Sequence, residues 1–194
     1  MALDLFYFIS TLPGLKSTGE GAPRLADFLV SCRDALSEKE YALLEGLSLC
    51  PPALWHETAS GNAVVKEWYG WQTAMRNAIV AFRARSLRVE GAKYRREEGE
   101  GSGFIGDLKR LMAILEEKTA WKRQQGWEAL QWSKLDELEP PLRFCFDALV
   151  VYALKLRLLE VRRSYSAEAG RSVFEEILKA RLAEASAHRV QSEG

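Results

Sequence analysis

The chain has 194 residues, with 27 Lys and Arg residues against 27 Asp and Glu residues and only two His. This length fits one compact domain or two small ones. The balanced charge excludes a general polyanion binder that relies on its overall field. A composition of 47% apolar and 28% charged residues is typical of a folded protein.

Helical periodicity dominates the sequence, and only the first few residues are compatible with a strand. A first helix is expected at about residues 23–36, where the apolar positions follow one helical face. Ser37 and Glu40 then have the spacing of a capping box, in which each side chain bonds the backbone N–H of the other residue. They predict a second helix at about residues 37–49.

The middle of the chain carries the clearest helical stripe. Its apolar residues advance by steps of four and three, which predicts one long helix packed along a neighbour. They are Val64, Trp68, Trp71, Met75, Ile79 and Phe82. Residues 104–138 are expected to be helical as well, with a break at Gly126.

The last third of the chain predicts two more helices. The first opens at Pro140-Pro141 and covers residues 142–161, which are so apolar that we place this helix at the centre of the bundle. Ser166 is the expected cap of a final helix. The resulting fold is all-α, with six or seven helices in an irregular bundle.

We expect a single helical domain over residues 1–194, in which a flexible Gly/Glu-rich loop near 97–103 separates two halves. The longest uncharged run in the apolar helix, residues 148–154, is far below the roughly 20 residues that cross a bilayer. No export signal is expected, because the N-terminal apolar stretch lacks a basic start and contains Pro13. The chain is therefore expected to be cytoplasmic.

Residues that could support catalysis or metal binding are scarce. His56 and His188 have no partner at a readable spacing, and no phosphate-loop, dinucleotide, nucleophile-elbow or zinc-protease motif occurs. The cysteines form no CxxC pair, so we expect neither a disulfide framework nor a zinc site. Two interpretations of the acidic cluster stay open, a metal site and a solvated helix end; its members are Asp136, Glu137 and Glu139. We expect no enzyme and no cofactor.

Two groups of residues are candidates for partner binding. Residues 76–96 carry seven basic side chains against one acid, which predicts either a charged partner-binding face or a solvated face neutralised by the acids that follow. Three tryptophans recur at steps of six and five, so they cannot share one face, and at least one is expected to be exposed at an interface. The candidates are Arg76, Arg83, Arg85, Arg88, Trp121, Trp127 and Trp132.

Several segments resemble a bacterial family of unknown function, the domain-of-unknown-function family numbered 2764. They are FYFISTLP at 6–13, the helix at 68–88, WSKLDELE at 132–139, ALVVYALKL at 148–156 and GRSVFEE at 170–176. The resemblance covers most of the chain, and its motifs are packing motifs without chemistry. It therefore identifies a family more readily than an activity.

Genes of this family lie among those for V-type (A/V-type) ATP synthase subunits, in bacterial operons that lack an ordinary C subunit. The resemblance thus implies a non-catalytic accessory or structural subunit, similar to part of the helical C (d/AC39) subunit that couples the central stalk to the membrane ring. It would place the chain peripherally on the inner face of the membrane. The alternative is a helical nucleic-acid-binding or regulatory protein that uses residues 76–96, although no aromatic residues interleave there as a stacking platform requires.

Overall fold

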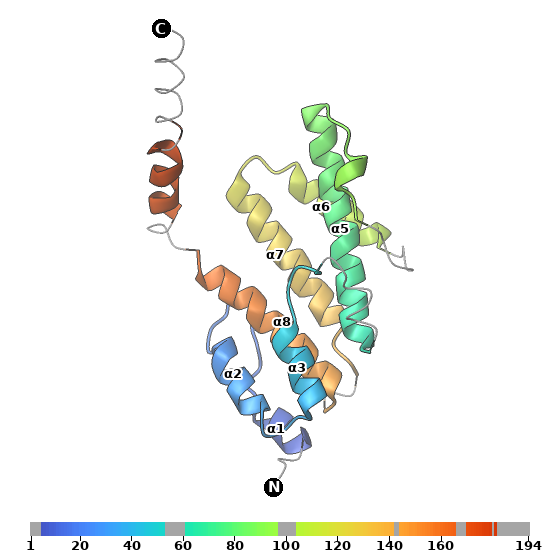
Figure 1. Ribbon diagram of the computed structural model, residues 1–194, viewed down its shortest axis with the longest axis vertical. Coiled ribbons are helices and arrows are strands. Elements are labelled where there is room, and N and C mark those ends of the chain that lie inside the picture. Colours follow the sequence, from blue (N-terminus) through green and yellow to red (C-terminus); the bar gives the residue numbers. More distant parts are fainter. Residues whose placement is uncertain are drawn as a thin grey trace, which may run out of the picture. The chain divides into compact units, whose positions relative to one another are not determined.

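In a computed structural model of the chain, the described residues form helices joined by turns and loops (Figure 1). No strand occurs among these residues. The structure describes residues 5–52, 61–96, 104–141, 144–165, 170–179 and 181. Its elements are α1 (Leu5–Thr11), α2 (Leu25–Cys32), α3 (Glu38–Gly46), α5 (Ala63–Leu87), the 3-10 helix η1 (Ala92–Tyr94), α6 (Ile105–Leu115), α7 (Ala120–Glu137) and α8 (Phe146–Arg163). The expected all-α fold is confirmed, with slightly more elements than six or seven.

Helix α8 is the packing centre of the first compact unit, which ends at Leu159. Nine residues of this helix are buried. The Asp147 side chain accepts from Asn62 before α5, and Tyr152 donates to the Pro13 carbonyl after α1. Arg157 donates to the last carbonyls of α3, among them that of Glu45. The central position expected for this apolar helix is therefore supported by contacts to three other segments of the chain.

The helix ends differ from those that the sequence predicts. The N-terminal residues, where a strand was the alternative, form α1, because Leu5, Phe8 and Ile9 share one helical face that packs on the core. The helix expected at residues 23–36 is shorter and corresponds to α2, which ends at Cys32. There the backbone N–H of Ala35 donates to the Cys32 carbonyl in a turn. The capping box that begins α3 is confirmed.

The long apolar stripe forms α5, as predicted. Trp68, Trp71 and Met75 on this stripe are fully buried. Asn62 caps the helix by accepting from the backbone N–H three residues later. The helix ends at Leu87, and the C-cap residue Arg88 adopts a left-handed conformation with φ 55°.

Gly126 does not break a helix, so that prediction is wrong. The break falls at residues 116–119, and Thr119 caps the start of α7 by accepting from the Lys122 backbone N–H. Gly126 lies within α7, where a Cβ atom would come within 2.9 Å of the Ile114 side chain on α6. Its missing side chain lets the two helices approach closely.

Replacing Gly126 with alanine is expected to lower the free energy of unfolding by about 1 kcal/mol. The overlap with Ile114 costs roughly 1–3 kcal/mol, which exceeds the roughly 1 kcal/mol that alanine gains over glycine in a helix. Urea denaturation followed by circular dichroism measures the change.

Gly106 provides the matched control, because it lies in α6 with open space around its Cα. Gly106→Ala should stabilise the chain by up to about 1 kcal/mol. Equal effects of Gly106→Ala and Gly126→Ala would show that the α6–α7 contact does not require a glycine.

The second compact unit comprises Glu160–Gly194. Residues 170–179 are helical and expose an apolar face formed by Val173, Phe174, Ile177 and Leu178. The division between the units falls at Leu159 and Glu160. The expected cap at Ser166 and the expected loop at 97–103 lie outside the described residues.

Candidate partner-binding groove

Residues of helices α5, α6 and α7 line an open, mainly apolar groove of about 630 Å³, here called the α5–α7 groove. Its apolar lining comes from all three helices and includes Ile79, Phe82, Leu87, Ile114, Leu115 and Trp127. Leu87, at the last turn of α5, is 71% exposed. The groove is therefore an open apolar surface and not a closed cavity of the core.

The groove exists because the apolar stripe of α5 extends past the residues that the core covers. The stripe is fully buried at Met75 and only partly buried at Ile79 and Phe82. On α7, the small side chain of Ala120 lies about two turns before Trp127 along the same lining. Near the end of α5, the apolar stripe is therefore no longer fully covered. Its exposed part lies beside α6 and α7 and forms one wall of the groove.

The charge at the groove is purely basic. Arg83 of α5 and Arg123 of α7 line it, both side chains are exposed, and no acidic residue is among its described lining. Neither arginine forms an ion pair within the part of the chain that the structure describes. Two cationic side chains therefore border an apolar floor.

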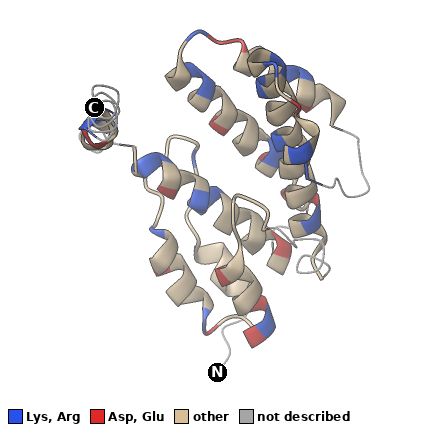
Figure 2. Cartoon of the chain, turned by 45° about the horizontal axis from the view of Figure 1, so that its top comes forward, with Lys and Arg blue, Asp and Glu red and all other residues tan. Residues whose placement is uncertain are grey.

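The other basic residues of the predicted segment differ in whether they bond another part of the chain. Arg85 and Arg88 are exposed near the end of α5 and do not line the groove. Figure 2 shows the Lys and Arg positions of the described chain in blue. Arg76 is half-buried, and its Nη2 donates to Cys50 Sγ at 2.8 Å. At the far end of the basic segment, Arg96 donates to the Pro51 carbonyl at 2.7 Å. Arg76 and Arg96 therefore each bond another segment of the chain, whereas Arg83, Arg85 and Arg88 between them are exposed.

The three candidate tryptophans lie in three different environments, as their spacing predicts. Trp121 is 57% exposed at the start of α7. Trp127 lines the groove and stacks on Trp71 with ring centroids 5.6 Å apart and an interplanar angle of 3°. Trp132 is half-buried beneath the ammonium of Lys155, 5.4 Å from the ring centre. The structure therefore unites only Arg83 and Trp127 of the predicted residues in one groove.

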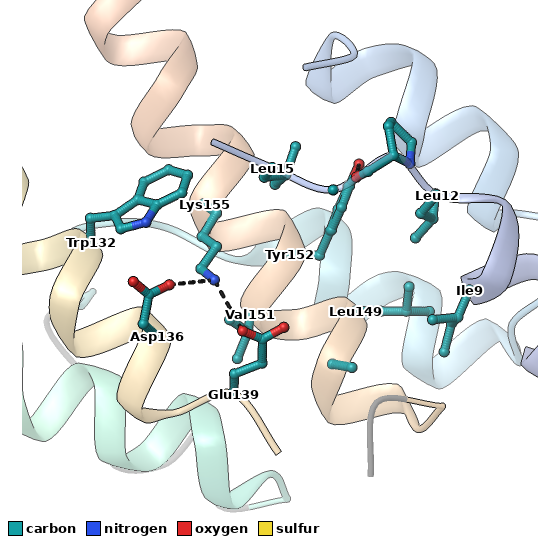
Figure 3. A pocket seen from close by; sticks show the side chains of 13 residues that line it. Ile9, Leu12, Leu15, Trp132, Asp136, Glu139, Leu149, Val151, Tyr152 and Lys155 are labelled. Carbon is teal, nitrogen blue, oxygen red and sulfur yellow. Dashed lines mark hydrogen bonds and ion pairs between the residues drawn. The ribbon is translucent and has the colours of Figure 1, made fainter. Parts of the chain in front are cut away.

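A second, smaller hollow of about 400 Å³ lies between the segment after α1 and the helices α7 and α8 (Figure 3). Its charged centre is Lys155, whose Nζ lies 2.7 Å from Asp136 Oδ1 and 3.4 Å from Glu139 Oε2. Glu137 pairs with another buried lysine, Lys134, at 3.6 Å. Lysine ammonium groups therefore occupy the positions between the acids where a cation would bind.

This pairing gives the acidic cluster a structural role that neither of the two interpretations included. Lys134 also binds Glu67 on α5 at 2.9 Å, so the acids are not simply solvated at a helix end. No group of three potential metal ligands occurs within the described residues. The cluster joins α7 to α5 and α8 through two buried lysines, a role that sequence spacing did not indicate.

The cysteines differ strongly in accessibility. Cys32 is fully buried in α2, and this burial raises the pKa of its thiol from 9.0 to about 12. Cys50 is exposed. Because thiolates are the reactive species, Cys32 should be inert towards thiol reagents in the folded chain.

A thiol-labelling experiment with Ellman's reagent near pH 8 tests this difference. We expect Cys50 to react fast and Cys32 to react only at the rate of unfolding. Cys50→Ser should remove the fastest phase and leave a slower one from half-buried Cys145, and Cys32→Ala should leave both phases intact. A fast phase that disappears with Cys32→Ala would contradict the buried position of this thiol.

His56 and His188 lie outside the described residues. Among the helices that the structure describes, none combines the length and the apolar character needed to cross a bilayer.

Arg123 and Leu87 are groove residues that the sequence interpretation missed. Arg123 lies one turn before Trp127 on α7, so the spacing of four was a usable signal. Leu87 offered no such signal, because its exposed position depends on where α5 ends.

Comparison with known proteins gives one family match. A family model described as "Protein of unknown function (DUF2764)" matches residues 25–185, a range that contains all three helices of the groove. No curated protein and no solved structure matches the chain.

Proposed function

The chain belongs to the DUF2764 family of proteins of unknown function, and on this premise we propose that it is a non-catalytic accessory or structural subunit of a bacterial V-type ATP synthase or ATPase. Its role resembles that of the C subunit, which couples the central stalk to the membrane ring. The rotary assembly is the expected partner because the family resemblance implies that genes of this kind lie among those for its subunits. The chain then acts at the inner face of the membrane through the complex.

The α5–α7 groove is the observation that carries a binding role. It presents an apolar floor beside two arginines, and such a surface is typical of a site that a partner protein covers. The buried core behind it is continuous, since Trp127 of the groove stacks on the fully buried Trp71. A rigid backing of this kind suits a subunit that transmits force between partners.

Purification of the native ATPase tests the proposal. We expect the chain to be recovered together with A, B, D and E type subunits, and cross-links from the complex should include residues of α5 or α7. An intact complex that is recovered without this chain would remove the proposal.

A second candidate function rests on a separate observation. Arg83, Arg85 and Arg88 are exposed along the end of α5, which favours a nucleic-acid-binding or regulatory role. If these three arginines neutralise three phosphates, the logarithm of affinity should fall with that of salt concentration with a slope of about −3. A flat salt response, or no binding to nucleic acid at low salt, would eliminate this candidate.

A further inference from the structure

The occupant of the α5–α7 groove can be narrowed by its geometry. All of the lining belongs to helices or their ends. Their backbone N–H and C=O groups bond within the helices, so the groove offers no open sheet edge for an added strand. Recognition must therefore use side chains on both partners, as when an amphipathic helix lies in an apolar groove.

The length of the groove along α5 limits how much of a partner helix can contact it. The α5 part of the lining runs from Ile79 to Leu87, which corresponds to about 12 Å at 1.5 Å per residue. A partner helix therefore contacts the groove over about two turns. Apolar residues at positions i, i+4 and i+7 of such a helix fall on one face and fit an apolar floor of this extent.

The two arginines of the groove determine which charged residues of the partner helix can lie beside its apolar face. Arg83 and Arg123 come from two different helices that line the groove, both are exposed, and neither has an ion pair within the described residues. A basic partner would place cations beside these arginines, whereas carboxylates would satisfy them with charge-assisted hydrogen bonds. The rim therefore selects acidic residues beside the apolar face.

Nucleic acid is a poorer fit to the same surface. One face of the Trp127 ring is covered by Trp71, in a nearly parallel stack at 3°. The floor is otherwise aliphatic apart from Phe82, and two arginines offer few phosphate contacts. The groove thus lacks the successive aromatic platforms on which bases stack.

We infer that the α5–α7 groove binds an acidic amphipathic helix of a partner protein, with apolar anchors on the floor and carboxylates paired to Arg83 and Arg123. This inference deepens the proposed function and rests on it for the identity of the complex. The chemistry of the occupant follows from the groove alone.

Labelled model peptides test the chemistry on the full chain. The probes are three helical peptides of about 18 residues: one with Leu and Phe on one face and Glu on the other, one with Lys in place of Glu, and a scrambled acidic peptide. Fluorescence anisotropy should show that the acidic amphipathic peptide binds about tenfold more tightly than the other two.

Two variants assign this preference to the groove. Arg83→Glu/Arg123→Glu should remove or reverse the preference for the acidic peptide, and Leu87→Asp should weaken its binding without disturbing the core, since Leu87 is mostly exposed. The control Arg85→Glu/Lys109→Glu makes the same change in charge on α5 and α6 outside the lining. It should leave affinity within about twofold of the original.

Three results would overturn the inference: equal binding of the acidic and basic peptides, an equal loss in the control variant, or displacement of the acidic peptide by a short DNA duplex. Whether the variant chain and the original chain are retained in the purified native ATPase distinguishes a failure of this inference from a failure of the proposed function. If the Arg83→Glu/Arg123→Glu variant is retained as well as the original chain, the groove inference fails alone. If the original chain is absent from the ATPase while peptide binding follows the expected pattern, the proposed function fails and the groove stands.

Discussion

Replacing Trp71 with alanine is expected to lower the free energy of unfolding by about 3–5 kcal/mol, the usual range for a fully buried tryptophan. Trp71 is the middle ring of a stack, with ring centroids 5.4 Å from Trp68 and 5.6 Å from Trp127. Its Nε1 also donates to Asp107 Oδ2 at 2.8 Å, which ties α5 to α6. The substitution therefore opens a cavity and removes the indole donor from the largely buried Asp107 carboxylate, which keeps its ion pair with Arg110 at 3.5 Å.

Urea denaturation followed by far-ultraviolet circular dichroism measures this loss independently of tryptophan fluorescence. Trp71→Phe keeps a ring in the stack and removes only the bond to Asp107, so it should cost about 1–2 kcal/mol plus a small packing loss. Trp121→Ala is the matched control, because this tryptophan is 57% exposed and its removal should change stability by no more than about 0.5 kcal/mol. Similar losses for Trp71→Ala and Trp121→Ala would contradict the stacked core.

The long helices could be predicted from sequence because their signal is local. The α5 stripe repeats every three or four residues, and the apolar α8 segment could be stable only when covered on most sides. Both expectations match buried positions such as Trp68 and Leu154. Periodicity within one helix needs no knowledge of the neighbours that cover it.

Helix ends and close contacts depend on other parts of the chain and were predicted less well. A glycine within a helical pattern is compatible with a break or with close packing, and only the position of Ile114 on α6 shows that Gly126 serves packing. The end of α2 at Cys32 likewise depends on a turn that the apolar pattern does not reveal.

The candidate site was half predictable for the same reason. Arg83 and Trp127 were named as candidate binding residues because charge and tryptophan content are visible in the sequence. Arg76 and Arg96 could not be separated from them, because their partners Cys50 and Pro51 lie 26 and 45 residues away. The groove itself exists only where three helices meet.

Replacing Lys155 with alanine is expected to lower the free energy of unfolding by about 2–4 kcal/mol. Its side chain is 9% exposed, so alanine removes the packing of the whole aliphatic stem on α8. The substitution also removes the cation from Asp136, from Glu139 and from the ring of Trp132. The two carboxylates then repel each other where α7 meets α8, and the penalty is moderate because both reach solvent.

Lys155→Met separates these contributions, since methionine keeps most of the stem and lacks the charge. We expect it to cost about 1 kcal/mol, and adding Asp136→Asn and Glu139→Gln should recover most of that loss, because no unpaired charge then remains. Lys16 provides a control from an exposed pair: it contacts Glu20 with side chains 67% and 76% exposed, so Lys16→Ala should change stability by less than about 0.5 kcal/mol. If Lys155→Ala costs no more than Lys16→Ala in the same denaturation experiment, the buried lysine does not hold α7 on α8, and the acidic cluster again becomes available to other cations.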